Sequence, residues 1–575
     1  MLKRIFSYMK QYKKYAYLAL ICIGIEVVLE LMVPMLMADL IDYGVAGADI
    51  PYIYTKGIQM GGCAILALIL GIGSSKFSAL AGQGLGANIR MAEYEKLQSY
   101  SFSNIDHFRV SSLVTRLTSD VTNIQNSVST GMRPFGRSPV MLIVATSVAF
   151  SINSTLALVF LVALPILAAM LIAIIVHIRP LYTKMQTAID LLNRTVGENL
   201  TAIRVVKAYV RGDYELEKFE EVNDNLKNQS EKAFKSAVLN MPAMQLVMYS
   251  TILGILLLGG HLVKQGELGI GQLTSFLSYV LIILNSLMMM SNVFLMMTRS
   301  LASGARIMEV LDEKIDITDE LARDISVERG EIEFDHVNFK YNEEAEEYVL
   351  SDISFHIEPG QTVGIIGQTG SAKTTLVQLI PRLYDVNEGV VKIDGVDVKE
   401  YPMRHLRDAI AMVLQKNTLF SGSLLSNLKW GNENATMEEI DEACHIACVD
   451  EFIDRLSDGY DTEMGQGGVN VSGGQKQRIC IARAILKKPK VLILDDSTSA
   501  VDTATEAKIR EGLAKELPDM TKIVIAQRIS SVRHADQIII LDKGRINGIG
   551  THESLLADNR IYQEIYESQK EGAEL

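Results

Sequence analysis

One short stretch of the chain combines residue types that bind phosphate. "GQTGSAKTT", Gly367–Thr375, follows the apolar run "TVGII" and precedes the helix-favouring "LVQLIPRLY". This is a P-loop in its strand–loop–helix context, where backbone N–H groups and the helix N-terminus bind phosphate oxygens. Lys373 is expected to reach the outer phosphates of a nucleotide, and Thr374 a Mg²⁺ ion. The nucleotide-binding residues predicted here are Gly367, Gln368, Thr369, Gly370, Ser371, Ala372, Lys373, Thr374 and Thr375.

Ala372 departs from this pattern, because P-loops usually carry glycine at that position. A methyl group is tolerated there if the backbone lies in the right-handed helical region. On that condition we expect nucleotide binding to survive the departure.

A second stretch, "VLILDDSTSAVD", Val491–Asp502, begins as an apolar run and continues into two adjacent acids. A buried strand would carry Asp495 to the carboxyl edge of a sheet, where ligands of open α/β sheets bind. There its carboxylate can hold the Mg²⁺ shell of a nucleotide. The alternative is an ordinary buried strand that ends on a capping aspartate.

The third stretch is "VSGGQKQR", Val471–Arg478. Together with the other two, it resembles the ATP-binding cassette (ABC) family, and the resemblance covers essentially the whole chain. It implies that the signature residues bind the γ-phosphate of ATP held by another subunit, so that two cassettes pair head to tail. It also implies that Tyr341 stacks on adenine, that Gln415 senses Mg²⁺, and that Asp502 lies in the loop crossing the dimer interface. The signature residues are Ser472, Gly473, Gly474 and Gln475.

Two positions depart from the family's pattern. The residue after Asp495 is usually the glutamate that polarises the attacking water, and here it is Asp496, which is one methylene shorter. The switch histidine is replaced by Gln527, which can donate a hydrogen bond but cannot become a cation. Both catalytic positions are therefore degenerate, and we expect a site that binds ATP with Mg²⁺ but hydrolyses it poorly. Since a homodimer would have no competent site, the resemblance favours a heterodimer with a second, homologous half-transporter chain.

The composition requires more than one domain to position these residues. The chain has 575 residues, of which 48% are hydrophobic and 21% charged. Residues 1–325 contain apolar stretches long enough to span a bilayer, and residues 326–575 contain short β-runs and the three motifs. We expect a multi-domain membrane protein, with an all-α six-helix transmembrane domain followed by an α/β P-loop nucleotide-binding domain. The six predicted spans are Tyr15–Ile41, Gly57–Leu80, Pro139–Asn153, Leu156–His177, Met241–Val263 and Gln272–Met297.

Charge distribution predicts the orientation of these spans. Five cations within residues 3–14 place the N-terminus on the cytoplasmic side of the cell membrane. Because the number of spans is even, the nucleotide-binding domain lies on the same side as the N-terminus. The half-transporter form of the chain favours a bacterial plasma membrane. The long charged connections, including "IDHFRVSSLVTRLTSD" and "YVRGDYELEKFEEV", are expected to contain coupling helices that dock on the cassettes. The net charge of −13 makes nucleic acid an unlikely partner.

The sequence says less about the transported substrate. Glu26 and Glu30 share a helix face inside the first span, where they could hold a cationic drug or contact a neighbouring helix. The methionine-rich run Leu287–Met297 suits a surface that repacks around varied substrates, or serves as lipid-facing filler. We expect ATP-driven export of small amphipathic or hydrophobic molecules by alternating access. A lipid or peptide exporter and a nucleotide-gated channel or regulatory subunit remain alternatives.

Overall fold

The computed structural model describes the backbone of residues 1–496 and 501–574, without the side chains of 161, 171, 175, 240, 287, 288, 291, 292, 294, 295, 298 and 571–574. The chain forms two compact units. The N-terminal unit comprises Met1–Leu97 and Ser111–Asp312, and the C-terminal unit comprises Gln98–Val110 and Glu313–Leu575. The predicted domain boundary at residue 325 stays a prediction.

The N-terminal unit is helical, and its helices bury a shared apolar core. One buried cluster includes Ile23 and Val27 of α2, Ala145 of α7, and Phe276 and Tyr279 of α12. The Tyr279 hydroxyl donates to the backbone oxygen of Leu31 at 2.7 Å, so this buried polar group is satisfied. The main helices are α1 (Leu2–Ser7), α2 (Lys13–Asp39), α3 (Ile50–Gln98), α5 (Val110–Thr115), α6 (Val121–Ser129), α7 (Met132–Ile152), α8 (Ser154–Thr201), α9 (Ile203–Ala208), α10 (Gly212–Val238), α11 (Asn240–Gln265) and α12 (Ile270–Asp312).

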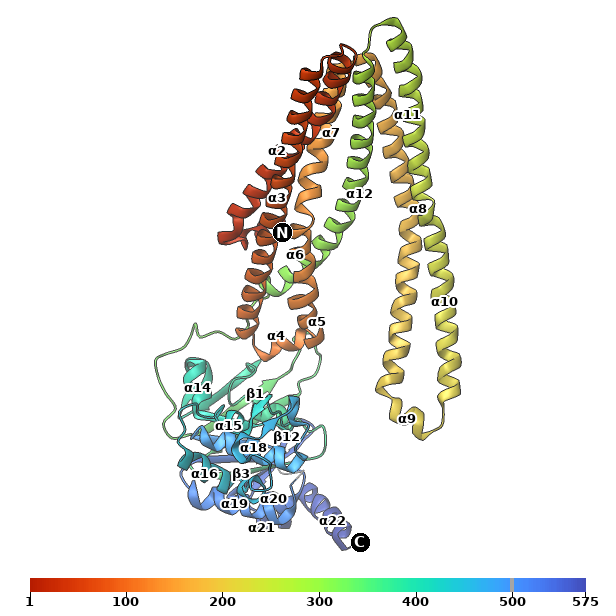
Figure 1. Cartoon of the computed structure of the whole chain (residues 1–575). Helices are drawn as coiled ribbons and strands as arrows, with labels where there is room; N and C mark the ends of the chain where they lie inside the picture. Colours follow the sequence, from red (N-terminus) through yellow and green to blue (C-terminus); the bar gives the residue numbers. More distant parts are fainter. Residues whose placement is uncertain (497–500, 575) are drawn as a thin grey trace. The chain divides into compact units, whose positions relative to one another are not determined.

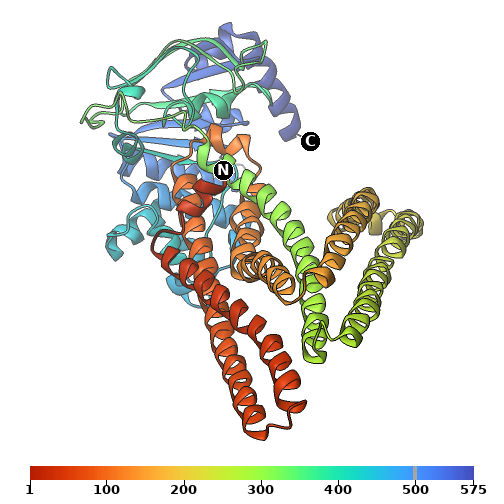
Figure 2. The same ribbon diagram turned by 90° about the horizontal axis from the view of Figure 1, so that it is seen from above.

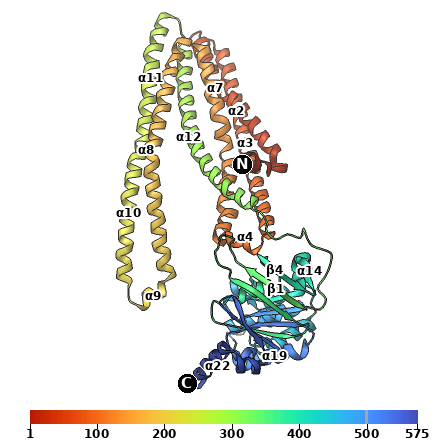
Figure 3. The same ribbon diagram turned by 180° about the vertical axis from the view of Figure 1, so that it is seen from behind.

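Helix α8 and the consecutive helices α10 and α11 form a long antiparallel pair, with α9 at the turn between them (Figure 1). The pair stays side by side when viewed from behind (Figure 3). Figure 2 shows it lying apart from α2 and α3 of the same unit. Helix α8 begins between the third and fourth predicted spans, where the Asn153 side chain accepts from the Leu156 N–H and caps the helix.

Five helical segments of the described residues are long and apolar enough to cross a membrane, judged by length and composition. They contain the first five predicted spans, except for Asn153 at the end of the third. The sixth predicted span lies in α12, where Ile270–Ser286 is a shorter apolar helix. Several side chains that follow it, among them most of the methionine-rich run Leu287–Met297, fall outside the description. The helical transmembrane domain is confirmed, whereas the exact count of six stays a prediction.

The C-terminal unit contains two main sheets. The six-stranded sheet has the order β12–β11–β3–β10–β9–β6, in which β11, β3, β10, β9 and β6 are parallel neighbours. The four-stranded antiparallel sheet has the order β2–β1–β4–β5. The interior strand β9 is buried along its whole length, as expected of a parallel strand covered on both faces. The strands of the larger sheet are β3 (Thr362–Ile366), β6 (Ile410–Val413), β9 (Val491–Asp495), β10 (Thr521–Ile525), β11 (Gln537–Asp542) and β12 (Arg545–Gly550). Those of the smaller sheet are β1 (Ile332–Phe339), β2 (Leu350–Ile357), β4 (Glu388–Ile393) and β5 (Val396–Asp397).

A short helix from the first long connection packs within the C-terminal unit. Helix α4 (Phe102–His107) begins at a capping box between Ser101 and Asn104. The Asn104 amide donates to the backbone oxygen of Lys314 at 2.8 Å, and the Asp106 carboxylate accepts from the Tyr384 hydroxyl at 2.6 Å. Part of the first predicted coupling segment therefore docks on this unit, as expected.

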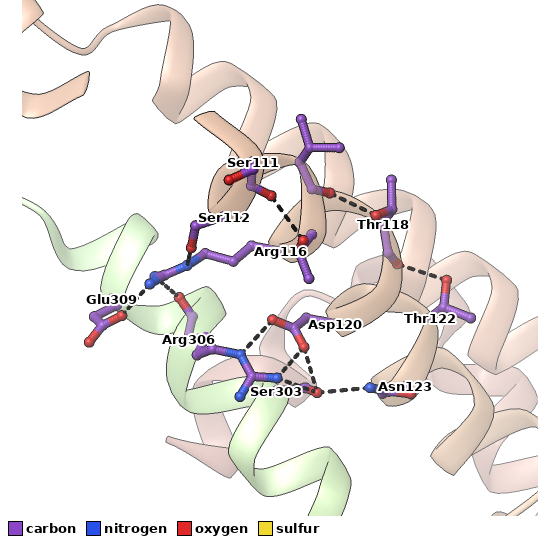
Figure 4. A network of polar contacts seen from close by, with 12 residues as sticks. Ser111, Ser112, Arg116, Thr118, Asp120, Thr122, Asn123, Ser303, Arg306 and Glu309 are labelled. Atoms are coloured by element: carbon purple, nitrogen blue, oxygen red, sulfur yellow. Dashed lines mark hydrogen bonds and ion pairs between the residues drawn. The ribbon is translucent and has the colours of Figure 1, made fainter. Parts of the chain in front are cut away.

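Within the N-terminal unit, a polar network joins α12 to the π-helical turn η3 (Arg116–Asp120), as Figure 4 shows. The Asp120 carboxylate is almost fully buried and accepts from both Arg306 and Ser303. Arg116 contacts the Glu309 carboxylate at 2.7 Å and donates to the backbone oxygen of Arg306 at 2.6 Å. The bidentate pair of Arg306 with Asp120 thus fixes the last turns of α12, and this is the strongest geometry for an arginine and a carboxylate.

Replacing Arg306 by glutamine should destabilise the N-terminal unit. The substitution removes the cation and leaves a buried carboxylate, a change that costs about 3 kcal/mol or more. We expect a loss of about 3 kcal/mol in the free energy of unfolding, measured on the full-length chain in detergent by denaturant titration and circular dichroism. The control is Arg560→Gln, because the Arg560–Glu564 pair is exposed and should contribute little. Equal losses in both variants would contradict the role assigned to Asp120 and Arg306.

Candidate functional site

Four neighbouring parallel strands end at one edge of the six-stranded sheet, and each is followed by a predicted site residue. Strand β3 leads into the P-loop, and β10 leads to Gln527. Strand β9 ends on Asp495 and is followed by Asp496, and β6 is followed by Gln415. Because the carboxyl ends of parallel strands meet at one edge, this order brings together residues that are far apart in the chain.

The P-loop has the local geometry that a phosphate-binding loop needs. Gly370 has a φ of +86°, and a Cβ there would meet open space. The Lys373 ammonium donates to the backbone oxygens of Gly367 and Gln368, at 2.9 Å each, so the side chain folds over the loop. Burial lowers the pKa of Lys373, and the nearby carboxylates of Asp496 and Asp495 oppose that shift.

Ala372 does not have the conformation assumed from the sequence. Its φ of +70° and ψ of 27° lie in the left-handed region, immediately before helix α13 (Lys373–Gln378). The methyl group of a non-glycine residue is strained there, at a cost of about 1–2 kcal/mol. The assumption that the backbone at Ala372 lies in the right-handed helical region is therefore wrong. The glycine common at this position is explained by the backbone conformation, and Ala372 packs part of its surface against the core of the unit.

Thr374 and Asp495 form a pair suited to a hard divalent cation. The Thr374 hydroxyl donates to Asp495 Oδ1 at 3.0 Å. Asp495 is almost fully buried, and its Oδ2 has no hydrogen-bond partner among the residues described. Burial raises the pKa of Asp495, opposed by the Thr374 hydrogen bond. A buried carboxylate oxygen without a donor beside a hydroxyl oxygen fits Mg²⁺, which prefers oxygen ligands.

The two degenerate positions are in direct contact. The Gln527 amide donates to Asp496 Oδ2 at 2.7 Å, and the Gln415 amide lies 3.4 Å from the same oxygen. Asp496 has a φ of +47°, a conformation that aspartate tolerates better than most residues, and its N–H donates to the Ile525 oxygen of β10. Burial raises the pKa of Asp496, and the two amide hydrogen bonds oppose the rise. Its carboxylate therefore joins the ends of β6, β9 and β10.

Tyr341 lies beside the P-loop helix and belongs to an aromatic group that the sequence analysis missed. Its hydroxyl is 2.9 Å from Thr375 Oγ1, and about half of the residue's surface is exposed. Its ring meets that of Tyr384 edge to face, with centroids 5.1 Å apart. Since Tyr384 also donates to Asp106, this tyrosine connects the predicted adenine residue with helix α4. No spacing rule indicated it, because 43 residues separate it from Tyr341 in the numbering.

The signature residues stand at a helix N-terminus, where orphan N–H groups favour anions. Ser472 caps α18 (Gly473–Leu486), and its side chain and that of Gln475 form a capping box. Ser472 and Gly473 are exposed, and Gly474 is half-buried. One turn further, the Gln477 amide lies 3.4 Å from the backbone oxygen of Asp496.

Asp502 is the exposed N-cap of α19 (Thr503–Glu516) and accepts from the N–H and hydroxyl of Thr505. These hydrogen bonds lower its pKa. Residues 499 and 500 of the "SAVD" motif lie outside the described residues. Its predicted place at a dimer interface stays a prediction.

Glu26 and Glu30 are paired with arginines of a neighbouring helix. Arg133 of α7 contacts Glu26 at 2.6 Å, and Arg137 contacts Glu30 at 2.6 Å and Glu26 at 3.3 Å. Of the two possibilities kept open, the structure shows the contact with a neighbouring helix. The arginines were missed, although their i, i+4 spacing matches that of the acids. The pairs border a pocket of about 670 Å³ lined by both acids and Arg133.

A second pocket, of about 420 Å³, is apolar and lies between α1, α2, α6, α7 and α12. Its lining includes flexible and aromatic side chains from segments far apart in the sequence. Two of them belong to the end of the methionine-rich run. The residues that matter here are Phe6, Met9, Met132, Phe135, Met296 and Met297.

Two family models match the chain. The model of the ABC transporter transmembrane region matches residues 17–287, and the ABC transporter model matches residues 350–499. The chain is also similar to solved structures. One is a bacterial Atm1-family ABC exporter with ATP bound, 24% identical, which covers 98% of both chains with a TM-score of 0.82.

Three curated relatives show how similar the sequences are. An uncharacterised ABC transporter ATP-binding protein of Bacillus subtilis, YfiB, is 38% identical over 100% of both chains. An ATP-dependent lipid A-core flippase of Desulfotalea psychrophila is 34% identical over 85% of both. A Staphylococcus aureus protein, whose name provisionally assigns it to multidrug export, is 32% identical over 99% of this chain and 100% of its own.

Replacing Ala372 by glycine should stabilise the C-terminal unit. Relief of left-handed strain, about 1–2 kcal/mol, exceeds the entropic cost of glycine, about 0.5–1 kcal/mol. We expect a gain of up to about 1 kcal/mol in the free energy of unfolding. The chain has a single tryptophan, Trp430, which lies in this unit, so denaturant titration can be followed by its fluorescence.

Ala409→Gly provides the matched control. Ala409 packs against the same core but ends helix α14 (Met403–Ala409), where glycine is unfavourable. It should lose about 0.5–1 kcal/mol. The same sign for both variants would show that the strain assigned to Ala372 is wrong.

Proposed function

Because the chain belongs to the ABC transporter family, with its transmembrane and ATP-binding parts fused, we propose that it is the degenerate-site subunit of a heterodimeric exporter. The function is ATP-driven export of small amphipathic or hydrophobic molecules by alternating access. The second subunit is a homologous half-transporter. The observation that carries the proposal is the 2.7 Å contact between Gln527 and Asp496, the two catalytic positions where the chain departs from the family's pattern.

That contact bears directly on hydrolysis. A general base must be free to accept a proton from the attacking water and must lie within hydrogen-bond reach of it. Asp496 is one methylene shorter than glutamate, and its Oδ2 accepts from the Gln527 and Gln415 amides. A misplacement of about 1 Å can cost about 10²-fold in rate. These features favour a site that holds ATP and turns it over slowly.

The residues that would hold the nucleotide fit that role. Lys373 and the N–H groups of the P-loop would bind the phosphates, and Tyr341 would stack on adenine. Thr374 and Asp495 would hold Mg²⁺, with Gln415 nearby. When bound, the ion neutralises charge on the outer phosphates. The signature at the N-terminus of α18 would complete the ATP site of the partner subunit, with Asp502 crossing between the cassettes.

The substrate class rests on the N-terminal unit. The pocket lined by Met9, Met132, Met296 and Met297 offers polarisable side chains that can repack around varied apolar molecules. Each acid near the other pocket is paired with an arginine, so that pocket has balanced charge. The name of the Staphylococcus aureus relative supports multidrug export.

Lipid export is the second candidate, favoured by the similarity to a lipid A-core flippase. The two candidates are separated by ATP-dependent transport in inverted membrane vesicles, with a fluorescent dye in one arm and a labelled lipid in the other. The proposed location is a bacterial plasma membrane with the ATPase domain on the cytoplasmic side.

The isolated chain should show little ATPase activity, because both sites of any homodimer carry Asp496 and Gln527. We expect turnover about 10²-fold below that of the complex with the partner, measured by phosphate release in detergent or nanodiscs. Within the complex, Lys373→Ala should preserve most of the activity, whereas Ser472→Arg in the signature should abolish it. Robust turnover by the isolated chain would refute the heterodimer.

Restoring both catalytic positions should raise hydrolysis at this site. The combined variant Asp496→Glu and Gln527→His regains a longer carboxylate and an imidazole. The measurement is single-turnover hydrolysis in a complex whose partner subunit has a disabled P-loop. The control, Asp496→Asn with Gln527→His, has no base and should stay at the background rate. If the control rises equally, Asp496 is not the limiting residue.

A further inference from the structure

The C-terminal helix α22 (Arg560–Glu574) contacts the loop that carries Gln527. Its residue Gln569 makes two hydrogen bonds with that loop. The side-chain oxygen accepts from the Ile529 N–H at 2.8 Å, and the side-chain amide donates to the Gln527 backbone oxygen at 2.8 Å. One glutamine therefore holds the peptide groups on both sides of Arg528.

This pair of bonds supplies a cap that the loop itself lacks. Arg528 is the N-cap of the short helix α20 (Ile529–Val532), and its side chain makes no capping hydrogen bond. The first N–H groups of a helix have no partner within the helix and need an acceptor from elsewhere. Gln569 provides that acceptor from a distance of 40 residues, so the turn after β10 depends on the C-terminal helix.

Packing brings Gln569 to this position. Tyr562 of α22 is fully buried and its hydroxyl is 2.8 Å from His552 Nδ1. Tyr562 shares a core cluster with residues on either side of the loop, Ala526 and Ile529, and with Ile366 at the end of β3. Ile565 and Tyr566 pack against the same cluster. Positions 562, 565, 566 and 569 fall on one face of a helix, so the face that packs also carries the amide.

From these contacts we propose that Gln569 is a positioning residue, which holds Gln527 within hydrogen-bond distance of Asp496. The chain of contacts runs from α22 through Gln569 to the loop, and from the Gln527 side chain to Asp496 Oδ2. The C-terminal helix is then part of the nucleotide site, although it lies at the far end of the sequence. We call the two hydrogen bonds of Gln569 the clamp, and the clamp rests on those bonds alone. Its functional consequence rests on the proposed nucleotide site.

The clamp is tested by hydrogen–deuterium exchange of the full-length chain. The variant is Gln569→Met, which keeps the length and apolar stem of the side chain but removes both hydrogen bonds. Losing a bond of this kind should accelerate exchange of the Ile529 amide by about fivefold to tenfold. Gln563→Met is the matched control, because the Gln563 amide, on the same helix, donates to the oxygens of Leu556 and Ala557. Unchanged exchange at Ile529 in Gln569→Met would overturn the clamp.

The functional consequence is tested by titrating the same variants with fluorescent analogues of ATP and ADP in the presence of Mg²⁺. Gln569→Met should weaken affinity for the ATP analogue by about threefold or more, with the ADP analogue little affected, because the family's switch position, here Gln527, acts at the γ-phosphate end. In a Gln527→Ala background the same substitution should have no effect. A merely structural role predicts equal losses for both nucleotides in both backgrounds, and that result would overturn the proposal. If the unsubstituted chain binds neither nucleotide, the nucleotide site fails, and the exchange result still decides the clamp.

Discussion

Strand order in the parallel part of the six-stranded sheet is the constraint on which the site depends. Strands β3, β10, β9 and β6 are neighbours in the sheet, and each ends beside a different part of the proposed nucleotide site. Only β9 and β10 follow one another in the chain, and every parallel pair needs a crossover connection, so the site exists only when the long crossovers are in place. The hydrogen bonds of Asp496 with Gln527 and Gln415 then join the ends of three strands. Loss of this order would separate the P-loop, Gln415, the Asp495–Asp496 pair and Gln527 from one another.

Features of the site that depend on residues close together in the chain could be predicted from the sequence. The P-loop, the signature and the acidic strand end are short motifs, and the structure gives each of them the expected local setting. The backbone at Ala372 could not be predicted, because one residue type does not determine the sign of φ. Contacts at long range were also missed. Glu26 and Arg133 are 107 residues apart, and periodicity within one helix does not show which neighbouring helix provides the counter-charge.

The N-terminal unit uses buried charge in two ways. The Asp120 carboxylate accepts hydrogen bonds from Arg306 and from Ser303, so most of its hydrogen-bonding capacity is used. Glu26 contacts both Arg133 and Arg137 and shares Arg137 with Glu30, and its Oε2 has no hydrogen-bond partner among the residues described. Buried carboxylates without full compensation are costly, and in a membrane they border cavities or partners. The first pair suits a fixed joint between helices. The second, beside a pocket, suits a place where polar contacts change during transport.

The replacement of an imidazole by an amide changes how Asp496 is held. An amide N–H donates at every pH, whereas an imidazole donates or accepts according to its protonation state. Gln527 therefore keeps its contact with Asp496 without any change of charge, and Gln569 fixes the backbone from which it extends. A carboxylate held in this way gains fixed geometry, and its Oδ2 is less available to water. The rigid placement of the carboxylate and the proposed slow hydrolysis would both follow from these hydrogen bonds. In the proposed heterodimer, such a site would stabilise the nucleotide-bound cassette pair, and the reset of the transport cycle would depend on hydrolysis at the partner's site.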